Sequence, residues 1–134
     1  MTRVLVSLLA SAWLAACAPS PTPPAVSAVA CTAIDGDTIR CGRTTVRLSN
    51  IDTPEKGRLA RCSAEAALAA RATAFTAQRL AAGPVEIVPD AKRSRDRYGR
   101  TLATVRVAGQ DLGEALIAAG LARRWDGRRR PWCP

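Results

Sequence analysis

Acidic residues stand close together in two short segments of the chain. The first segment, DGDT at residues 35–38, places Asp35 and Asp37 on either side of a glycine. The second, RLSNIDTPE at residues 47–55, carries an arginine, an aspartate and a glutamate. Hard cations such as calcium bind where several oxygen ligands converge. The two segments therefore suggest a metal site, although a plain hairpin turn explains the first alone and a surface ion-pair cluster explains the second alone.

A third segment, RDRYGR at residues 95–100, combines charged residues with a tyrosine and a glycine just before an expected strand. Taken alone it reads as a solvated charged turn. The chain contains no histidine, which excludes Ser-His-Asp and Cys-His catalysis and histidine-ligated zinc. Acid–base chemistry at neutral pH must therefore fall to carboxylates, water, tyrosine or arginine.

The formal net charge is +9, and most of the positive charge is arginine. A balance of this kind attracts polyanions, with nucleic acid as the first candidate and an anionic membrane surface as the second. Arginine also binds phosphate with a planar, two-pronged set of donors. A merely soluble basic protein is the alternative interpretation.

The N-terminal residues predict export. A single arginine precedes an apolar run that ends at Ala16, too short to span a bilayer and typical of a signal peptide. The following Cys17 completes a lipoprotein-like box and would become the lipidated first residue, unless an ordinary signal peptide is cut near Ala18. We expect a signal peptide over 1–17, a proline-rich tether over 18–28 and a folded domain over 29–134, located in the periplasm, on the membrane or outside the cell.

Four further cysteines, in an oxidising compartment, suggest two disulfides, for which the sequence permits three pairings. Cys31 and Cys41 flank an expected hairpin, so their pairing is preferred, and Cys62 would then join Cys133 and tie the C-terminus to the domain. A zinc site is the competing explanation, but the spacing lacks a CxxC pair.

Turn signals and alternating apolar residues predict an α+β, mainly β domain. Ser63 is expected to cap a helix whose apolar face carries Leu68, Ala72 and Phe75. The order suits a five-stranded OB-fold barrel, with a helix between strands three and four and a second helix after strand five. The expected strands are 28–34, 38–41, 44–51, 85–88 and 102–107, and the expected helices are 63–82 and 111–120.

In content and order, the segments DGDT, RL…IDTPE and DRYGR resemble the staphylococcal nuclease (thermonuclease) family. The resemblance extends into GQDLGEALIAAGLA at residues 109–122 and covers roughly residues 28–124. It implies a monomeric, metal-dependent exported nuclease that hydrolyses phosphodiester bonds of DNA and/or RNA and leaves 3′-phosphate ends.

The same resemblance implies a role for individual residues. A calcium ion, or magnesium, would lie between Asp37, Asp52 and the backbone carbonyl of Thr53 and act as a Lewis acid on a phosphate oxygen. Asp35 would support the turn. Glu55 matches the carboxylate that orients or deprotonates the attacking water.

Four basic or aromatic residues complete the implied site. Arg47 and Arg100 match two arginines that stabilise charge on the phosphate in the transition state. Arg97 and Tyr98 match positions that contact a neighbouring phosphate.

The C-terminal part departs from the family. Tyrosines that stack on a base are absent, and Trp125 is expected either to replace them or to pack in the core. The family's long C-terminal helix is also missing, and a Cys62–Cys133 disulfide would take over its stabilising role. Arginines 128–130 would add phosphate contacts or form a solvated tail. Two other functions stay open: a non-catalytic nucleic-acid-binding OB-fold module of the cell envelope, and an envelope protein that binds anionic lipid or polysaccharide.

Overall fold

The computed structural model describes residues 30–134. The expected signal peptide, the lipidation site Cys17 and the proline-rich tether lie outside the described residues. None of the helices over 30–134 is both long and apolar enough to cross a membrane.

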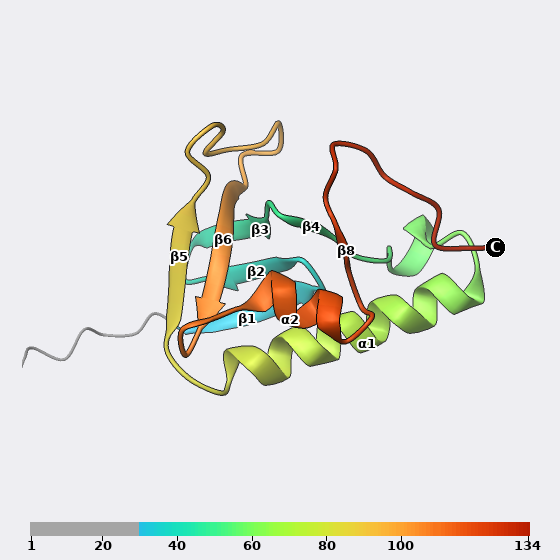
Figure 1. The fold of residues 1–134 in the computed structure, drawn as a ribbon, viewed down its shortest axis with the longest axis horizontal. Helices are drawn as coiled ribbons and strands as arrows, with labels where there is room; N and C mark the ends of the chain where they lie inside the picture. The colour runs from blue at the N-terminus through green and yellow to red at the C-terminus, as the bar shows by residue number, and fades with distance from the viewer. Residues whose placement is uncertain (1–29) are drawn as a thin grey trace, which may run out of the picture.

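Five main strands form one curled sheet (Figure 1). β1 (Cys31–Asp35), β2 (Thr38–Cys41) and β3 (Thr44–Leu48) make an antiparallel meander. β3 then pairs in parallel with β6 (Thr101–Val107), which pairs antiparallel with β5 (Val85–Pro89). The resulting order, β1-β2-β3-β6-β5, is that of an OB-fold, a partly open Greek-key barrel.

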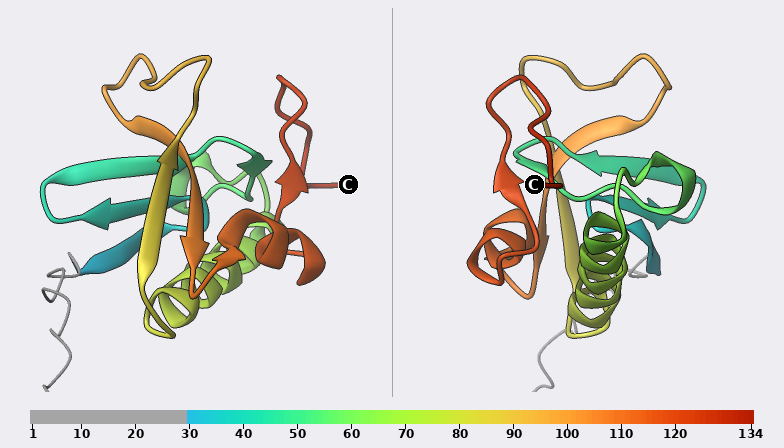
Figure 2. Two further views of the ribbon diagram at one scale, coloured as in Figure 1. Left: turned by 60° about the vertical axis from the view of Figure 1, so that its left-hand side comes forward. Right: turned by 90° about the vertical axis from the view of Figure 1, so that its right-hand side faces the viewer.

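Two helices pack on this sheet (Figures 1 and 2). α1 (Ser63–Leu80) follows β3 and packs against β1, and α2 (Leu112–Ala118) follows β6 and contacts both β6 and α1. A helix thus lies between the third and fourth main strands and another follows the fifth, so the predicted fold class is confirmed. The short elements are β4 (Ile51–Asp52), η1 (Gly57–Leu59), β7 (Gln110–Asp111) and β8 (Arg123–Arg124).

The detail of α1 differs from the sequence prediction. Its N-cap is Cys62, whose sulfur accepts a hydrogen bond from the backbone N–H of Glu65, so the predicted cap at Ser63 is wrong by one position. Leu68 and Phe75 are only partly buried. Small side chains form much of the buried stripe because they let the helix approach the sheet closely; the buried residues of α1 are Glu65, Ala69, Ala72, Thr76 and Leu80.

Two disulfides supplement a core of isoleucine, leucine, valine and alanine side chains. Cys31–Cys41 joins paired positions of β1 and β2, and Cys62–Cys133 joins the start of α1 to the chain end. This is the pairing that the sequence analysis preferred, and it leaves none of these four cysteines as a zinc ligand.

Gly36 is required at its position by a close approach to α1. A Cβ atom on Gly36 would lie 2.7 Å from the Cβ of Ala72 and 3.0 Å from Thr53 Cγ2. Its carbonyl oxygen accepts a 2.7 Å hydrogen bond from the buried hydroxyl of Thr76. The glycine therefore holds the turn that carries Asp37 directly against the helix.

Gly36→Ala is expected to lower the free energy of unfolding by about 1–3 kcal/mol, because the added methyl overpacks the contact with Ala72. Urea unfolding measures the change. The double variant Gly36→Ala/Ala72→Gly should recover part of the loss, since it removes the closest clash. Strictly additive effects of the two substitutions would contradict this account.

Candidate active site

Two turns that are distant in the sequence meet around one arginine. Asp37 follows β1, and Asp52 ends β4 and is followed by Thr53. Arg47 Nη1 lies 2.9 Å from Asp37 Oδ2, and its Nη2 lies 3.7 Å from Asp52 Oδ1. The backbone N–H of Thr53 donates to Asp37 Oδ2 at 3.2 Å. The structure thus brings together the residues that the sequence analysis assigned to a metal site, and all three are buried.

The position of Arg47 follows from strand register. Thr38 pairs with Arg47 across β2 and β3, which places the arginine beside the turn that carries Asp37. Its Nη1 also donates to the carbonyls of Leu48, at 2.8 Å, and Ile51, at 3.1 Å. The guanidinium is therefore held by fixed partners and needs little reorganisation to meet a negative charge.

The buried carboxylates repel one another. Burial raises the pKa of Asp52, and the neighbouring Asp37 raises it further, against the opposing effects of Arg129, Trp132 and Arg47. Among residues 30–134, buried Asp52 Oδ1 has no hydrogen-bond partner.

This donor set suits a hard divalent cation. Asp52 Oδ1, which accepts no hydrogen bond from residues 30–134, a carboxylate oxygen of Asp37 and the backbone carbonyl of Thr53 are oxygen ligands of the kind that calcium or magnesium prefers. Asp35 lies nearby, and burial followed by the charge of Asp37 raises its pKa as well.

Glu55 stands in a loop that α1 fixes. The backbone N–H of Glu55 donates to Glu65 Oε1 at 3.2 Å, and that of Arg61 donates to Glu65 Oε2 at 2.8 Å. Glu65 is 4 % exposed. Sequence reasoning missed Glu65, although an acid three residues after the helix cap is a capping-box signal.

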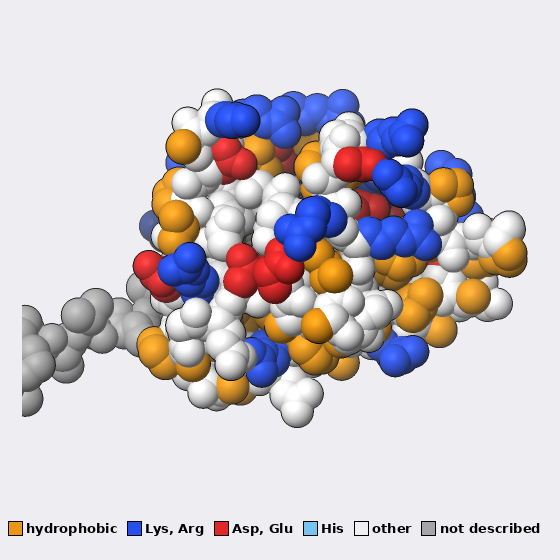
Figure 3. All heavy atoms as spheres, viewed as in Figure 1, with side chains coloured by type: hydrophobic (Ala, Val, Ile, Leu, Met, Phe, Trp, Pro, Cys, Tyr) orange, Lys and Arg blue, Asp and Glu red, His pale blue; other side chains and the backbone are white. Residues whose placement is uncertain are grey.

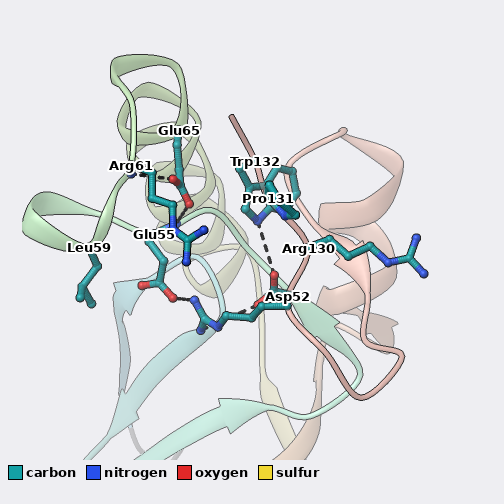
Figure 4. Close-up of a pocket in the computed structure, with 9 residues that line it drawn as sticks. Asp52, Glu55, Leu59, Arg61, Glu65, Arg130, Pro131 and Trp132 are labelled. Carbon is teal, nitrogen blue, oxygen red and sulfur yellow. Dashed lines mark hydrogen bonds and ion pairs between the residues drawn. The ribbon is translucent and has the colours of Figure 1, made fainter. Parts of the chain in front are cut away.

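The C-terminal tail, residues 123–134, lies over the same carboxylates (Figure 4). Arg129 forms an ion pair with Glu55, and its Nη2 lies 3.8 Å from Asp52 Oδ1. Trp132 Nε1 donates to Asp52 Oδ2 at 3.4 Å. These groups line a cavity of about 300 Å³. None of these three contacts was predicted from the sequence, in which nothing distinguishes Arg129 from its neighbouring arginines.

Arg100 lines a second, separate hollow. Its Nε lies 2.6 Å from Asp96 Oδ2, and it lines a second cavity of about 300 Å³ together with Arg43, Thr45 and Tyr98. Thr45, which lines this second cavity, lies two residues from Arg47 on β3, a spacing of about 7 Å along the strand. The partner of Arg100 is therefore Asp96, whereas Arg47 is the arginine that contacts Asp37 and Asp52.

Two aromatic side chains, Tyr98 and Trp125, are exposed on the surface. Tyr98 is 68 % exposed, and the guanidinium carbons of Arg97 and Arg100 lie 4.8 and 5.4 Å from the centre of its ring. Trp125 is 38 % exposed and is not part of the core. In the space-filling view, Lys and Arg side chains gather along the edge formed by the β5–β6 loop and the tail (Figure 3).

The fold and this site define a small OB-fold protein with buried carboxylates beside an arginine and a basic face. The family described as "Staphylococcal nuclease homologue" matches residues 45–131, and the chain belongs to this family. Two relatives from Bacillus subtilis (strain 168), "Endonuclease YncB" and "SPbeta prophage-derived endonuclease YokF", are each 36% identical over 95 residues, or 68% of this chain. The chain spans 44% and 31% of their lengths, respectively.

Asp96 organises the loop that carries Arg100. Burial tends to raise its pKa, but the hydrogen bonds from Arg100 and from the backbone N–H of Tyr98 outweigh burial and lower it. The ionised carboxylate therefore stabilises the folded state above the ordinary aspartate pKa, and this stabilisation is lost as the pH falls through the lowered folded value.

Asp96→Asn is expected to reduce the free energy of unfolding by about 1 kcal/mol at pH 7, since it weakens hydrogen bonds to a charged group. At a pH below the folded pKa of Asp96, wild type and variant should have nearly equal stability. Urea unfolding at the two pH values measures both. If wild type and Asp96→Asn differed equally in free energy of unfolding at the two pH values, the charge of Asp96 would not be the cause of the stability difference.

Proposed function

We propose that the protein is a metal-dependent nuclease that hydrolyses phosphodiester bonds of DNA and/or RNA. The observation that carries the proposal is the meeting of Asp37 and Asp52 around Arg47, with one buried Asp52 oxygen left without a hydrogen bond. Family membership and the printed names of the two relatives support the same conclusion.

Asp37, Asp52 and the carbonyl of Thr53 would hold calcium, or magnesium, which supplies a Lewis acid for a phosphate oxygen. Arg47 stabilises the negative charge that builds on the phosphate in the transition state. Glu55 orients the attacking water or accepts its proton, and Glu65 fixes the loop from which Glu55 acts.

The hollow around Arg100 would bind the next part of the strand. Arg100 lines this hollow and provides charge for a phosphate, Arg97 lies beside Tyr98, and exposed Tyr98 offers a face on which a base can stack. Trp125, exposed elsewhere on the surface, would offer a second stacking face. Cleavage on this scheme leaves a 3′-phosphate.

Two disulfides favour an oxidising compartment, so we also propose that the protein acts after export. It would be free in the periplasm, secreted, or anchored through lipidated Cys17, and the lipid anchor and its monomeric state are expectations from the sequence.

A non-catalytic binding module on the same barrel is the competing function. The filled positions of the metal ligands and of Glu55 favour an enzyme. The purified protein would be incubated with end-labelled single-stranded DNA and with RNA, in calcium and in chelator, and the product ends would be tested for 3′-phosphate. We expect cleavage in calcium alone; tight binding without cleavage in calcium would instead identify a binding module.

A further inference from the structure

The tail is anchored at both ends beside the acidic residues. β8 pairs with β4, with Asp52 opposite Arg123 and Ile51 opposite Arg124. Over residues 30–134, β4 has β8 as its partner strand, so the tail holds the strand that carries Asp52. At its other end, Cys133 is bonded to Cys62 at the start of α1. The tail is therefore fixed in place at both ends and forms part of the site.

The three consecutive arginines of the tail have different partners. Arg128 and Arg130 both pair with Asp126, within the tail itself. Arg130 points away from the carboxylates that line the cavity (Figure 4). Arg129 alone of the three pairs with Glu55 and approaches Asp52.

The cavity needs an available cation if an anionic strand is to enter it. Its lining holds three acidic residues that would repel a phosphodiester and three arginines that would attract one: Asp52, Glu55 and Glu65, and Arg61, Arg129 and Arg130. Arg47 is largely committed to Asp37 and two backbone carbonyls. The side chain of Arg129 is 54 % exposed, lines the cavity and has donors to spare, since a guanidinium carries five N–H groups.

We propose that Arg129 is a substrate-binding residue that holds a phosphate of the bound strand on the Glu55 side of the cavity, kept there by the Cys62–Cys133 disulfide. The proposal rests on the proposed function, since it takes a nucleic-acid strand as the ligand. It also makes strand binding sensitive to reduction: breaking the disulfide frees one end of the tail and moves Arg129 away from its position.

Arg129→Ala is expected to weaken binding of a fluorescein-labelled single-stranded DNA about tenfold, as loss of one charged phosphate contact does. Fluorescence anisotropy in chelator measures binding without cleavage, so the result does not depend on whether the protein cuts. Arg128→Ala removes the same charge from the adjacent position and should change the dissociation constant less than twofold. Arg129→Lys, which keeps the charge, should recover part of the affinity.

Kinetics in calcium separate this role from a general structural effect. Arg129→Ala should raise KM more than it lowers kcat, and its circular dichroism should match that of wild type because the Arg129 side chain is 54 % exposed. Unchanged DNA affinity of Arg129→Ala would overturn the proposal. Faster cleavage by Arg129→Ala would also overturn it, because it would show that Arg129 blocks access of the substrate to the cavity. Failure of wild type to cleave, with the affinity difference intact, would instead count against the nuclease activity.

The disulfide is tested in the same binding assay. Cys62→Ser/Cys133→Ser should weaken DNA binding to about the level of Arg129→Ala, and adding Arg129→Ala should weaken it little more. Cys31→Ser/Cys41→Ser, which opens the other disulfide, should leave the affinity close to that of wild type. If the first pair does not fold, the comparison of Arg129→Ala with Arg128→Ala decides. A folded Cys62→Ser/Cys133→Ser variant with wild-type affinity would refute the role of the disulfide.

Discussion

Arg47→Lys is expected to lower kcat for cleavage of single-stranded DNA by about 10²–10³-fold, a loss of about 2.7–4 kcal/mol of transition-state stabilisation. Lysine keeps the charge but cannot reproduce the planar set of donors that now contacts Asp37 and the carbonyls of Leu48 and Ile51. Steady-state rates in calcium, measured on protein whose circular dichroism matches that of wild type, provide the value.

The matched control for this substitution lies on the neighbouring strand. Arg40 is exposed on β2, so Arg40→Lys should retain the wild-type rate within about twofold, as surface substitutions usually do. If Arg47→Lys retained more than half of the wild-type kcat, a transition-state role for Arg47 would have to be abandoned.

Asp52→Asn is expected to reduce cleavage at least about 10³-fold, because the amide offers a weaker oxygen ligand and leaves the cation site short of one negative charge. Stability should change in the opposite direction. The raised pKa of Asp52 means that its ionised form is disfavoured in the folded protein. This penalty is fully present above the raised folded pKa and is lost progressively as the pH falls from that value to the ordinary aspartate pKa.

Metal-free Asp52→Asn should therefore be at least as stable as metal-free wild type at pH 7, a difference that thermal unfolding in chelator measures. Glu86→Gln, at an exposed position of β5, removes one negative charge far from the expected ligands and should keep full activity. Cleavage by Asp52→Asn at a rate near that of wild type would show that this carboxylate is not a metal ligand.

Local signals in the sequence were sufficient to predict the framework of the fold. Asp111 caps α2 by accepting a 3.0 Å hydrogen bond from the backbone N–H of Glu114, as the capping-box pattern indicates. Gly120 has a positive φ of 70° just after that helix, as expected of a C-terminal stop. Each of these features depends on a few adjacent residues, which is why a single sequence suffices.

Contacts that depend on the path of the tail could not be predicted. The hydrogen bond between Trp132 and Asp52 joins positions 80 residues apart, and the ion pair of Arg129 with Glu55 also joins residues distant in the sequence. Their geometry follows from the β4–β8 ladder and the Cys62–Cys133 disulfide acting together. No periodicity in the sequence distinguishes Arg129 from Arg128.

The two arginines assigned to one phosphate also illustrate this limit. Sequence resemblance treats Arg47 and Arg100 as equivalent partners of the phosphate. The structure holds Arg47 within the acidic site and pairs Arg100 with Asp96 in a separate hollow. Side-chain partners of this kind depend on the loop between β5 and β6, whose course the turn residues alone do not specify.

Calcium titration of the purified protein by isothermal titration calorimetry tests the central proposal most directly. Wild type should bind one calcium ion per chain, and Asp52→Asn, otherwise folded, should lose this binding. Wild type that binds no calcium or magnesium, or Asp52→Asn that binds as tightly as wild type, would contradict the assignment of the cation to Asp37 and Asp52.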